Sequence, residues 1–281
     1  MVQSSEEIVA PVAVWQYLKE ICSEEYVEEL LEIVRDYTGD ELPNYSDSLR
    51  AAFREVEPIF TRPRYAEFFW HCATTIPAWT ARVILNNAQG ESEGSEKLLD
   101  LWRGIRSEAH VADQVMAHAR DESRHSRIFI RLTERAFPSD FESSDLQSLE
   151  ARLPDVRVGK HEKARTRIPE NHIIDHLVQM NIGEIRTRLH MHLFAPVVHG
   201  MAPADNKRAV RRLLGGLVRD EVRHIGYTAK LMESWAESGS GGLIRRLYRG
   251  RLKTFDQMTY QQTQDAVHHY GQGRFPDLLD V

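Results

Sequence analysis

The sequence predicts an all-α protein built around four long helices. Helical spacing of apolar residues recurs along the 281-residue chain, whereas strand-like alternation and hairpin turns are nearly absent. With 42% hydrophobic residues the chain can bury a substantial core, and we expect a single domain over residues 1–281. Its helical core is expected at about residues 64–237, between an N-terminal helical extension (1–60) and a C-terminal helix with a tail (243–281).

The helices of the predicted core are separated by recognisable turn signals. We expect the four long segments, in order, at about residues 64–88, 96–136, 170–199 and 206–237. The polar run Gln-Gly-Glu-Ser-Glu-Gly at 89–94 is expected to form the first turn, and Gly200 and Pro203 the last. Before the core, Ser46 is a candidate N-cap for a segment at 47–57, and after it the glycine-rich run 238–242 is expected to be a flexible break.

Charge and composition exclude several classes of protein. The formal net charge of -6 and a pI near 6.1 argue against a surface that coats nucleic acid. No apolar run approaches the ~20 residues that span a bilayer, and the N-terminus lacks the pattern of a signal peptide. Only Cys22 and Cys72 occur, too few for a disulfide framework. We expect a cytoplasmic protein that binds neither nucleic acid nor membranes.

A five-residue motif occurs twice in the predicted core. Residues 121–125 read Asp-Glu-Ser-Arg-His and residues 220–224 read Asp-Glu-Val-Arg-His. A lone Glu-x-x-His means little in a chain with 13 histidines, but random placement gives the full pentad in well under ~0.01 copies. Glu at i and His at i+3 share one helix face, so each pentad can offer a carboxylate and an imidazole to one metal ion.

Both pentads place their Glu and His on the apolar face of a helix. The two stripes are Val111, Val115, His118, Glu122, His125, Phe129 and Leu132, and Leu214, Leu217, Glu221, His224, Thr228, Leu231 and Trp235. A buried carboxylate requires a cation or a proton to compensate its charge. The alternative is a pair of Glu-Arg-His hydrogen-bond networks that only fix helix register, but two identical networks on inward faces favour bound metal.

A site for two metal ions needs two more carboxylates, which helix hairpin geometry locates. In an antiparallel pair, residues at one height are equidistant from the turn. The last turn centres near residue 202, so Glu221 should face Glu184. The first turn is expected at 93–95, so Glu122 should face Glu67, with Glu91 as the alternative in another register. Either partner could instead be a buried Glu bonded to a core Arg or Tyr.

This constellation resembles the ferritin-like di-iron and di-manganese carboxylate proteins over about residues 64–237. The resemblance implies a four-helix bundle with six metal ligands, Glu67, Glu122, His125, Glu184, Glu221 and His224, of which Glu122 and Glu221 bridge the ions. It also implies that Asp121 and Asp220 orient the imidazoles across the pair while Arg124 and Arg223 balance charge. Exposed ion pairs with no role at a metal site would place the same residue types at these four positions.

The resemblance implies an enzyme that activates O2 as a co-substrate with two iron ions, or with manganese. Phe129 stands where the ribonucleotide reductase small subunit keeps its radical tyrosine, which argues against a radical generator. Ferritins lack a second complete Glu-x-x-His pair, which argues against iron storage. Hydrocarbon monooxygenase components, acyl-carrier-protein desaturases and p-aminobenzoate N-oxygenase-like enzymes remain. We expect a biosynthetic oxidoreductase that N-oxygenates an amine. The alternatives are a desaturase or C-hydroxylase, and a metal-binding protein that is ferroxidase-like or has no turnover.

His118 lies one turn before Glu122, which gives His-x-x-x-Glu-x-x-His. The N-oxygenases are known for an additional histidine ligand at this spacing, but in the second pair, where this chain has Leu217. A seventh metal ligand and a hydrogen-bonded core histidine both fit this position.

The resemblance also implies partners. A small-molecule substrate and an electron donor such as a reductase or ferredoxin are expected, and a homodimer is allowed. The basic run between Arg245 and Lys253, interleaved with apolar residues, could dock an acidic carrier protein. A solvated helix face would give the same pattern.

Overall fold

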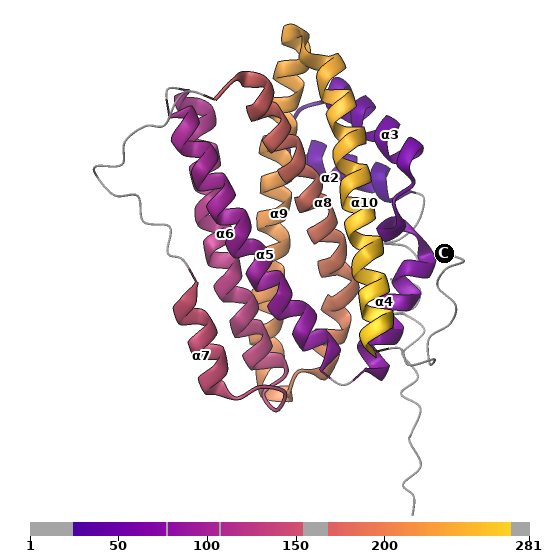
Figure 1. The fold of residues 1–281 in the computed structure, drawn as a ribbon, viewed down its shortest axis with the longest axis vertical. Helices are drawn as coiled ribbons and strands as arrows, with labels where there is room; N and C mark the ends of the chain where they lie inside the picture. The colour runs from indigo at the N-terminus through magenta and orange to yellow at the C-terminus, as the bar shows by residue number, and fades with distance from the viewer. Residues whose placement is uncertain (1–24, 77, 107, 154–167, 271–281) are drawn as a thin grey trace, which may run out of the picture.

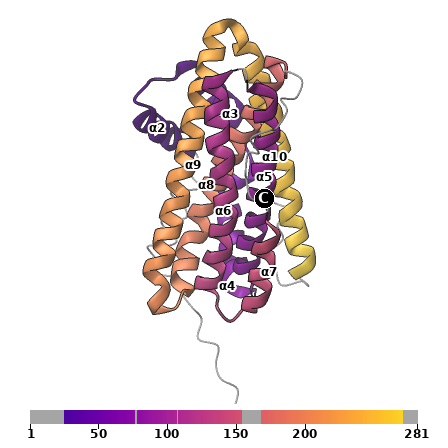
Figure 2. The same ribbon diagram turned by 90° about the vertical axis from the view of Figure 1, so that its left-hand side faces the viewer.

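The computed structural model describes residues 25–76, 78–106, 108–153 and 168–270, and within these ranges every regular element is a helix. The all-α prediction is therefore confirmed. Five long helices run along a common direction (Figure 1, Figure 2): α5 (Trp79–Ile105), α6 (Ala109–Ala136), α8 (Glu170–Met201), α9 (Lys207–Trp235) and α10 (Gly241–Tyr270). Consecutive helices pair, α5 with α6 and α8 with α9, and α6 packs against α9 to join the pairs.

The apolar stripes predicted from the sequence face this interior. Val115, Phe129 and Leu132 of α6 are fully buried, as is Leu217 of α9. The helix α8 is buried on a broader surface because α10 (Gly241–Tyr270) covers its outer side. The short elements η1 (Ile59–Thr61), α7 (Ser143–Arg152) and η2 (Ala204–Asn206) lie in the connections.

The prediction of a single long helix at residues 64–88 is wrong, because this region contains parts of two helices. The helix α4 (Pro63–Thr75) ends at Ile76, which is extended with φ -101° and ψ 116°. Pro77 follows in the sequence, and a residue before proline disfavours the α conformation. The next helix, α5, begins at Trp79 and runs unbroken through residues 89–94 to Ile105. The chain reverses between Ile105 and Ala109, not at the predicted turn.

The glycine at position 94 serves helix packing and not a turn. A Cβ atom on Gly94 would lie 3.1 Å from Oε2 of Glu122, so the missing side chain lets α5 approach α6. One residue on, the Ser95 hydroxyl donates a 2.8 Å hydrogen bond to the Ala119 carbonyl. The polar, glycine-containing stretch is therefore a face of close helix contact.

The N-terminal helices α2 (Tyr26–Thr38) and α3 (Pro43–Val56) pack against α9 and α10. The helix α3 begins at Pro43, about a turn earlier than a cap at Ser46 would place it. Its N-terminus is capped from another helix: the Glu233 carboxylate of α9 accepts hydrogen bonds from the N–H groups of Asn44 (3.2 Å) and Tyr45 (2.8 Å). The first part of the predicted extension, with Cys22, lies outside the described residues.

A kink at η3 (Ala236–Ser240) separates α9 from α10, where the sequence predicted a break. Gly239 adopts φ 103° there, a left-handed conformation that favours glycine. Tyr248 and Leu252 of α10 are fully buried. None of the described helices combines the length and the apolar character needed to cross a membrane. The predicted tail after residue 270 lies outside the described residues.

Candidate metal centre

Carboxylate and imidazole side chains from four helices meet in the interior between the two helix pairs. The group consists of Glu91 (α5), His118, Glu122 and His125 (α6), Glu184 (α8), and Glu221 and His224 (α9). None of these seven side chains is more than 7% exposed. We call this group the buried cluster.

One half of the buried cluster contains Glu91, Glu122 and His125. The Nδ1 atom of His125 lies 3.5 Å from Glu91 Oε2, 3.5 Å from Glu122 Oε1 and 3.6 Å from Glu221 Oε1. These separations are long for hydrogen bonds. They suit donors arranged around one metal ion with bonds of ~2.0–2.2 Å.

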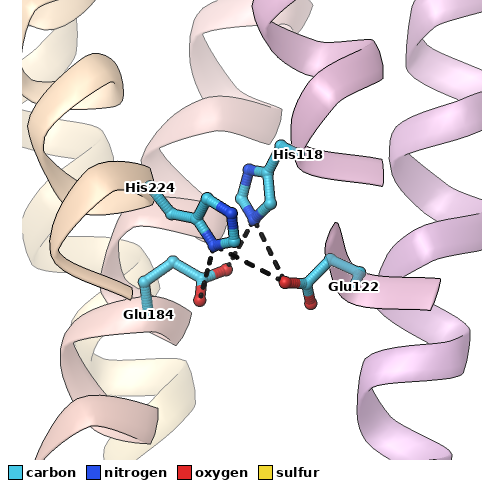
Figure 3. A group of neighbouring side chains, drawn as sticks. All are labelled: His118, Glu122, Glu184 and His224. Carbon is cyan, nitrogen blue, oxygen red and sulfur yellow. Dashed lines mark hydrogen bonds and ion pairs between the residues drawn. The ribbon is translucent and has the colours of Figure 1, made fainter. Parts of the chain in front are cut away.

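The other half contains His118, Glu122, Glu184 and His224 (Figure 3). His118 Nε2 lies 3.1 Å from Glu184 Oε1 and 3.4 Å from Glu122 Oε1. His224 Nδ1 lies 3.6 Å from Glu122 Oε1 and 3.8 Å from Glu184 Oε2. Figure 3 shows the two imidazoles side by side above the two carboxylates, with all four side chains directed toward a common space.

Glu67 does not belong to the buried cluster. It lies exposed on α4, so the prediction that it faces Glu122 is wrong. The reversal between Ile105 and Ala109 centres near residue 107, which brings Glu91 to the height of Glu122. The structure brings the other five predicted ligands together with Glu91, and their binding of metal remains a prediction.

The aspartates of the pentads contact the histidines of the opposite pentad. His125 Nε2 lies 3.1 Å from Asp220 Oδ2, and His224 Nε2 lies 3.3 Å from Asp121 Oδ2. Burial opposes ionisation of Asp220, but hydrogen bonds from His125 and Arg124 outweigh it and lower its pKa to about 2. The same balance lowers the pKa of Asp121. Because an ionised carboxylate only accepts, each Nε2 must donate, so in a neutral imidazole the Nδ1 lone pair is directed at the buried cluster.

Two arginines close a ring around these aspartates. Arg124 Nη2 lies 2.7 Å from both Asp121 Oδ1 and Asp220 Oδ2. Arg223 Nη2 lies 2.5 Å from Asp121 Oδ2 and 2.8 Å from Asp220 Oδ1. The four charges balance, and the ring ties α6 to α9 on the outer side of the histidines.

Unpartnered atoms in the buried cluster fit a bound cation. Within the described chain, six of its atoms have no hydrogen-bond partner: Glu91 Oε2, Glu122 Oε1, both Glu221 oxygens, His125 Nδ1 and His224 Nδ1. An unsatisfied buried polar atom costs about 1–3 kcal/mol, and a charged one more. Burial and neighbouring carboxylates raise the pKa values of Glu91 and Glu221. Two divalent cations would balance four ionised glutamates, so the donor set fits two metal ions.

Tyr227 is a neighbour of the buried cluster that the sequence analysis missed. Its hydroxyl lies 2.8 Å from His118 Nδ1, and the His118 ring stacks on His224 with centroids 3.7 Å apart. This contact leaves His118 Nε2 facing the carboxylates. The available signal was spacing, because Tyr227 follows His224 by three residues and therefore shares its helix face.

No protein-family model, no curated protein and no solved structure matches the chain. The case for its function therefore depends on the geometry of the buried cluster.

Proposed function

We propose that the chain is a ferritin-like di-iron oxygenase, with manganese as the alternative metal, whose four-helix bundle consists of α5, α6, α8 and α9. The observation that carries the proposal is the set of six unpartnered donor atoms in the buried cluster. In particular, each pentad histidine directs Nδ1 inward while an aspartate holds Nε2.

Each half of the buried cluster would hold one ion. Glu91 and His125 serve one ion, while Glu184, His224 and His118 serve the other. Glu122 Oε1 lies between 3.4 and 3.6 Å from a nitrogen of all three imidazoles, a central position suited to bridging. Glu221 has both oxygens buried without a partner and lies near His125 and His224, which suits the same role.

The chain's own side chains would prepare the site for oxygen chemistry. Two bound iron ions would supply electrons and Lewis acidity for the activation of dioxygen. The fully buried Val115, Phe129 and Leu217 lie within about a turn of the donors and exclude bulk water. The ring of aspartates and arginines fixes both imidazoles before any ion binds, so little reorganisation is required.

For the reaction we propose N-oxygenation of an amine. The resemblance stated above supports it. The third imidazole, His118, contacts the carboxylates of its half, but it lies in the first pair and not in the second, where the N-oxygenases have theirs. One atom of O2 would be transferred to nitrogen and the other reduced to water with two electrons and two protons. An external electron donor is therefore required. A desaturase or C-hydroxylase would use the same site and donor.

Partners and location remain expectations from the sequence. On α10, Arg249 and Lys253 pair with Glu55 (3.3 and 3.6 Å), so part of the basic run is already neutralised within the chain. An acidic carrier protein would meet the exposed Arg245 and Arg246 instead. We propose a cytoplasmic enzyme that acts on a free or carrier-linked small molecule.

Product analysis after exposure of reduced, iron-loaded protein to oxygen tests the function. With a panel of arylamines and amino-acid-derived amines, we expect hydroxylamine, nitroso or nitro products that are absent for Glu122→Ala. Loss of two hydrogens, or oxygen on carbon, would indicate the desaturase or hydroxylase alternative. Continued iron uptake into ferric oxide without an organic product would replace the proposal with a ferroxidase.

A further inference from the structure

A cavity of about 340 Å³ lies between α4, the start of α5, α8 and the end of α10. Figure 1 shows these segments together at the lower end of the molecule. The volume falls within the roughly 300–1,000 Å³ range of small-molecule sites. None of the seven residues of the buried cluster lines this cavity.

One wall of the cavity is aromatic. Phe69 and Trp79 meet edge to face with centroids 4.8 Å apart. His190 stacks on Tyr65 with centroids 5.7 Å apart, and its Nε2 lies 2.9 Å from the Tyr65 hydroxyl. Burial and the charge of Arg186 lower the pKa of His190, which keeps this ring neutral. An aromatic wall of this kind can pack against the flat, apolar ring of a ligand.

Arg186 brings a positive charge to the same cavity. Its Nε donates a 2.8 Å hydrogen bond to Thr259 Oγ1 and its Nη2 donates to Gln262 Oε1, and both acceptors are neutral. Among the described residues no carboxylate lies within 4.0 Å of this guanidinium. In contrast, Arg188 on the same helix lies 3.5 Å from Glu29.

The acidic residue of the cavity lining does not neutralise Arg186. Asp265 is exposed and accepts a 2.9 Å hydrogen bond from Gln261. A partly buried guanidinium without a counter-ion favours binding of an anion, and its planar fork matches a carboxylate.

The cavity approaches the buried cluster along α5. Asn87 of its lining precedes Glu91 by one turn of α5, a rise of about 6 Å on the same face. On α8, Arg186 follows Glu184 by only two residues, so the two side chains project from different faces of the helix. The cavity thus approaches the buried cluster only along α5, from the side of Glu91.

We propose that this cavity binds a small aromatic carboxylate, with the carboxylate on Arg186 and the ring against Phe69 and Trp79. That this molecule is the substrate rests on the proposed function, whereas its binding does not. The ligand class that fits the cavity is therefore small acidic aromatic compounds.

Binding to the metal-free full-length chain tests the proposal independently of any oxygen chemistry. Benzoate, 4-hydroxybenzoate, 3-phenylpropanoate and 2-naphthoate are titrated by calorimetry and by tryptophan fluorescence, with benzamide and sulfate as controls. We expect at least one carboxylate to bind, and Arg186→Gln to weaken it about tenfold or more. Arg186→Lys should keep part of the affinity. Arg208→Gln, an exposed arginine on α9, should change nothing.

Trp79 supplies a second readout if Arg186→Gln fails to fold. The fluorescence change should vanish in Trp79→Phe while calorimetry still detects binding. The proposal is overturned if no carboxylate of the panel binds, if benzamide or sulfate binds as well as the carboxylates, or if Arg186→Gln binds normally. Binding of the carboxylate panel, together with no oxidised product from the amines in the iron-loaded protein, would instead contradict the proposed function and leave the cavity assignment intact.

Discussion

The two halves of the buried cluster are held by the same outer frame, which is the ring of pentad aspartates and arginines around the histidines. They differ in the donor side chains inside that frame. On the outside the contacts are nearly equivalent, because each pentad histidine reaches the aspartate of the other pentad at 3.1 or 3.3 Å. On the inside, one half has His118 at the position where α9 carries Leu217. The other half has no such histidine, although each half receives one carboxylate from a neighbouring helix, Glu184 from α8 or Glu91 from α5.

This difference shows what the repeated pentad does and does not determine. The repeat sets the orientation of the imidazoles, since every member of the outer ring comes from the two pentads. The inequivalence comes from residues outside them, chiefly His118 with Tyr227. We therefore expect two ions held in similar frames but with different affinities.

The largest effect is expected from Glu122→Ala, because Glu122 contributes to both halves. Its oxygen faces all three imidazoles, so its removal should abolish binding of both ions. Glu221→Ala should behave in the same way. Elemental analysis of folded, reconstituted protein measures the loss, with Glu134→Ala, an exposed residue of α6, as the control. Retention of two ions by Glu122→Ala would show that the two halves do not share this carboxylate.

The next effect separates the halves. Glu91→Ala should remove the ion beside His125 and leave about one ion per chain, because Glu91 belongs to one half only. Glu67→Ala, an exposed change on α4, should keep two ions. Native mass spectrometry counts the ions bound by each variant and so shows whether Glu91 or Glu67 faces Glu122. The reverse outcome would restore the sequence-based assignment of Glu67.

The sequence indicated the second helix pair better than the first for a physical reason. Between α8 and α9, Pro203 lies in the real reversal, so counting residues from the turn brought Glu184 to Glu221. Between α5 and α6, the glycines at 90 and 94 resembled a turn although both lie inside a helix. A glycine inside a helix costs only about 1 kcal/mol, which helix packing readily outweighs.

Packing in three dimensions also explains what else the sequence missed. Gly94 is small because Glu122 approaches it, a contact that no local pattern reveals. The α3 cap comes from Glu233, nearly two hundred residues away, and not from the nearby Ser46. The pentad positions were predictable because a buried carboxylate beside a histidine is costly and therefore conspicuous on an apolar helix face.

A smaller effect should reveal the asymmetry itself. His118→Ala should retain two ions, while the ion beside His224 should bind up to ~100-fold more weakly, because only that half contains His118. The matched variant Leu217→Ala, at the equivalent position of α9, should leave both affinities within a few-fold. Stepwise anaerobic titration with ferrous iron measures both steps. Equal weakening of the two steps by His118→Ala would contradict the asymmetry.

The smallest effect is expected from the outer frame. Asp220→Asn should weaken the ion beside His125 about tenfold, because the amide oxygen still accepts from Nε2 but carries no charge. Asp121→Asn should act on the other ion, beside His224. The same titration with ferrous iron shows which of the two binding steps is weakened. If each substitution instead weakened the ion beside the histidine of its own pentad, the contacts between opposite pentads would not be the ones that orient the histidines.

The most direct test of the central claim is the number of ions that the unmodified chain binds. Native mass spectrometry after anaerobic reconstitution with ferrous iron, alongside circular dichroism, reports stoichiometry and folding together. We predict two ions per chain on a helical protein, with the two ions magnetically coupled because they share Glu122. A folded helical chain that binds a single zinc ion tightly, or no metal at all, would contradict the account.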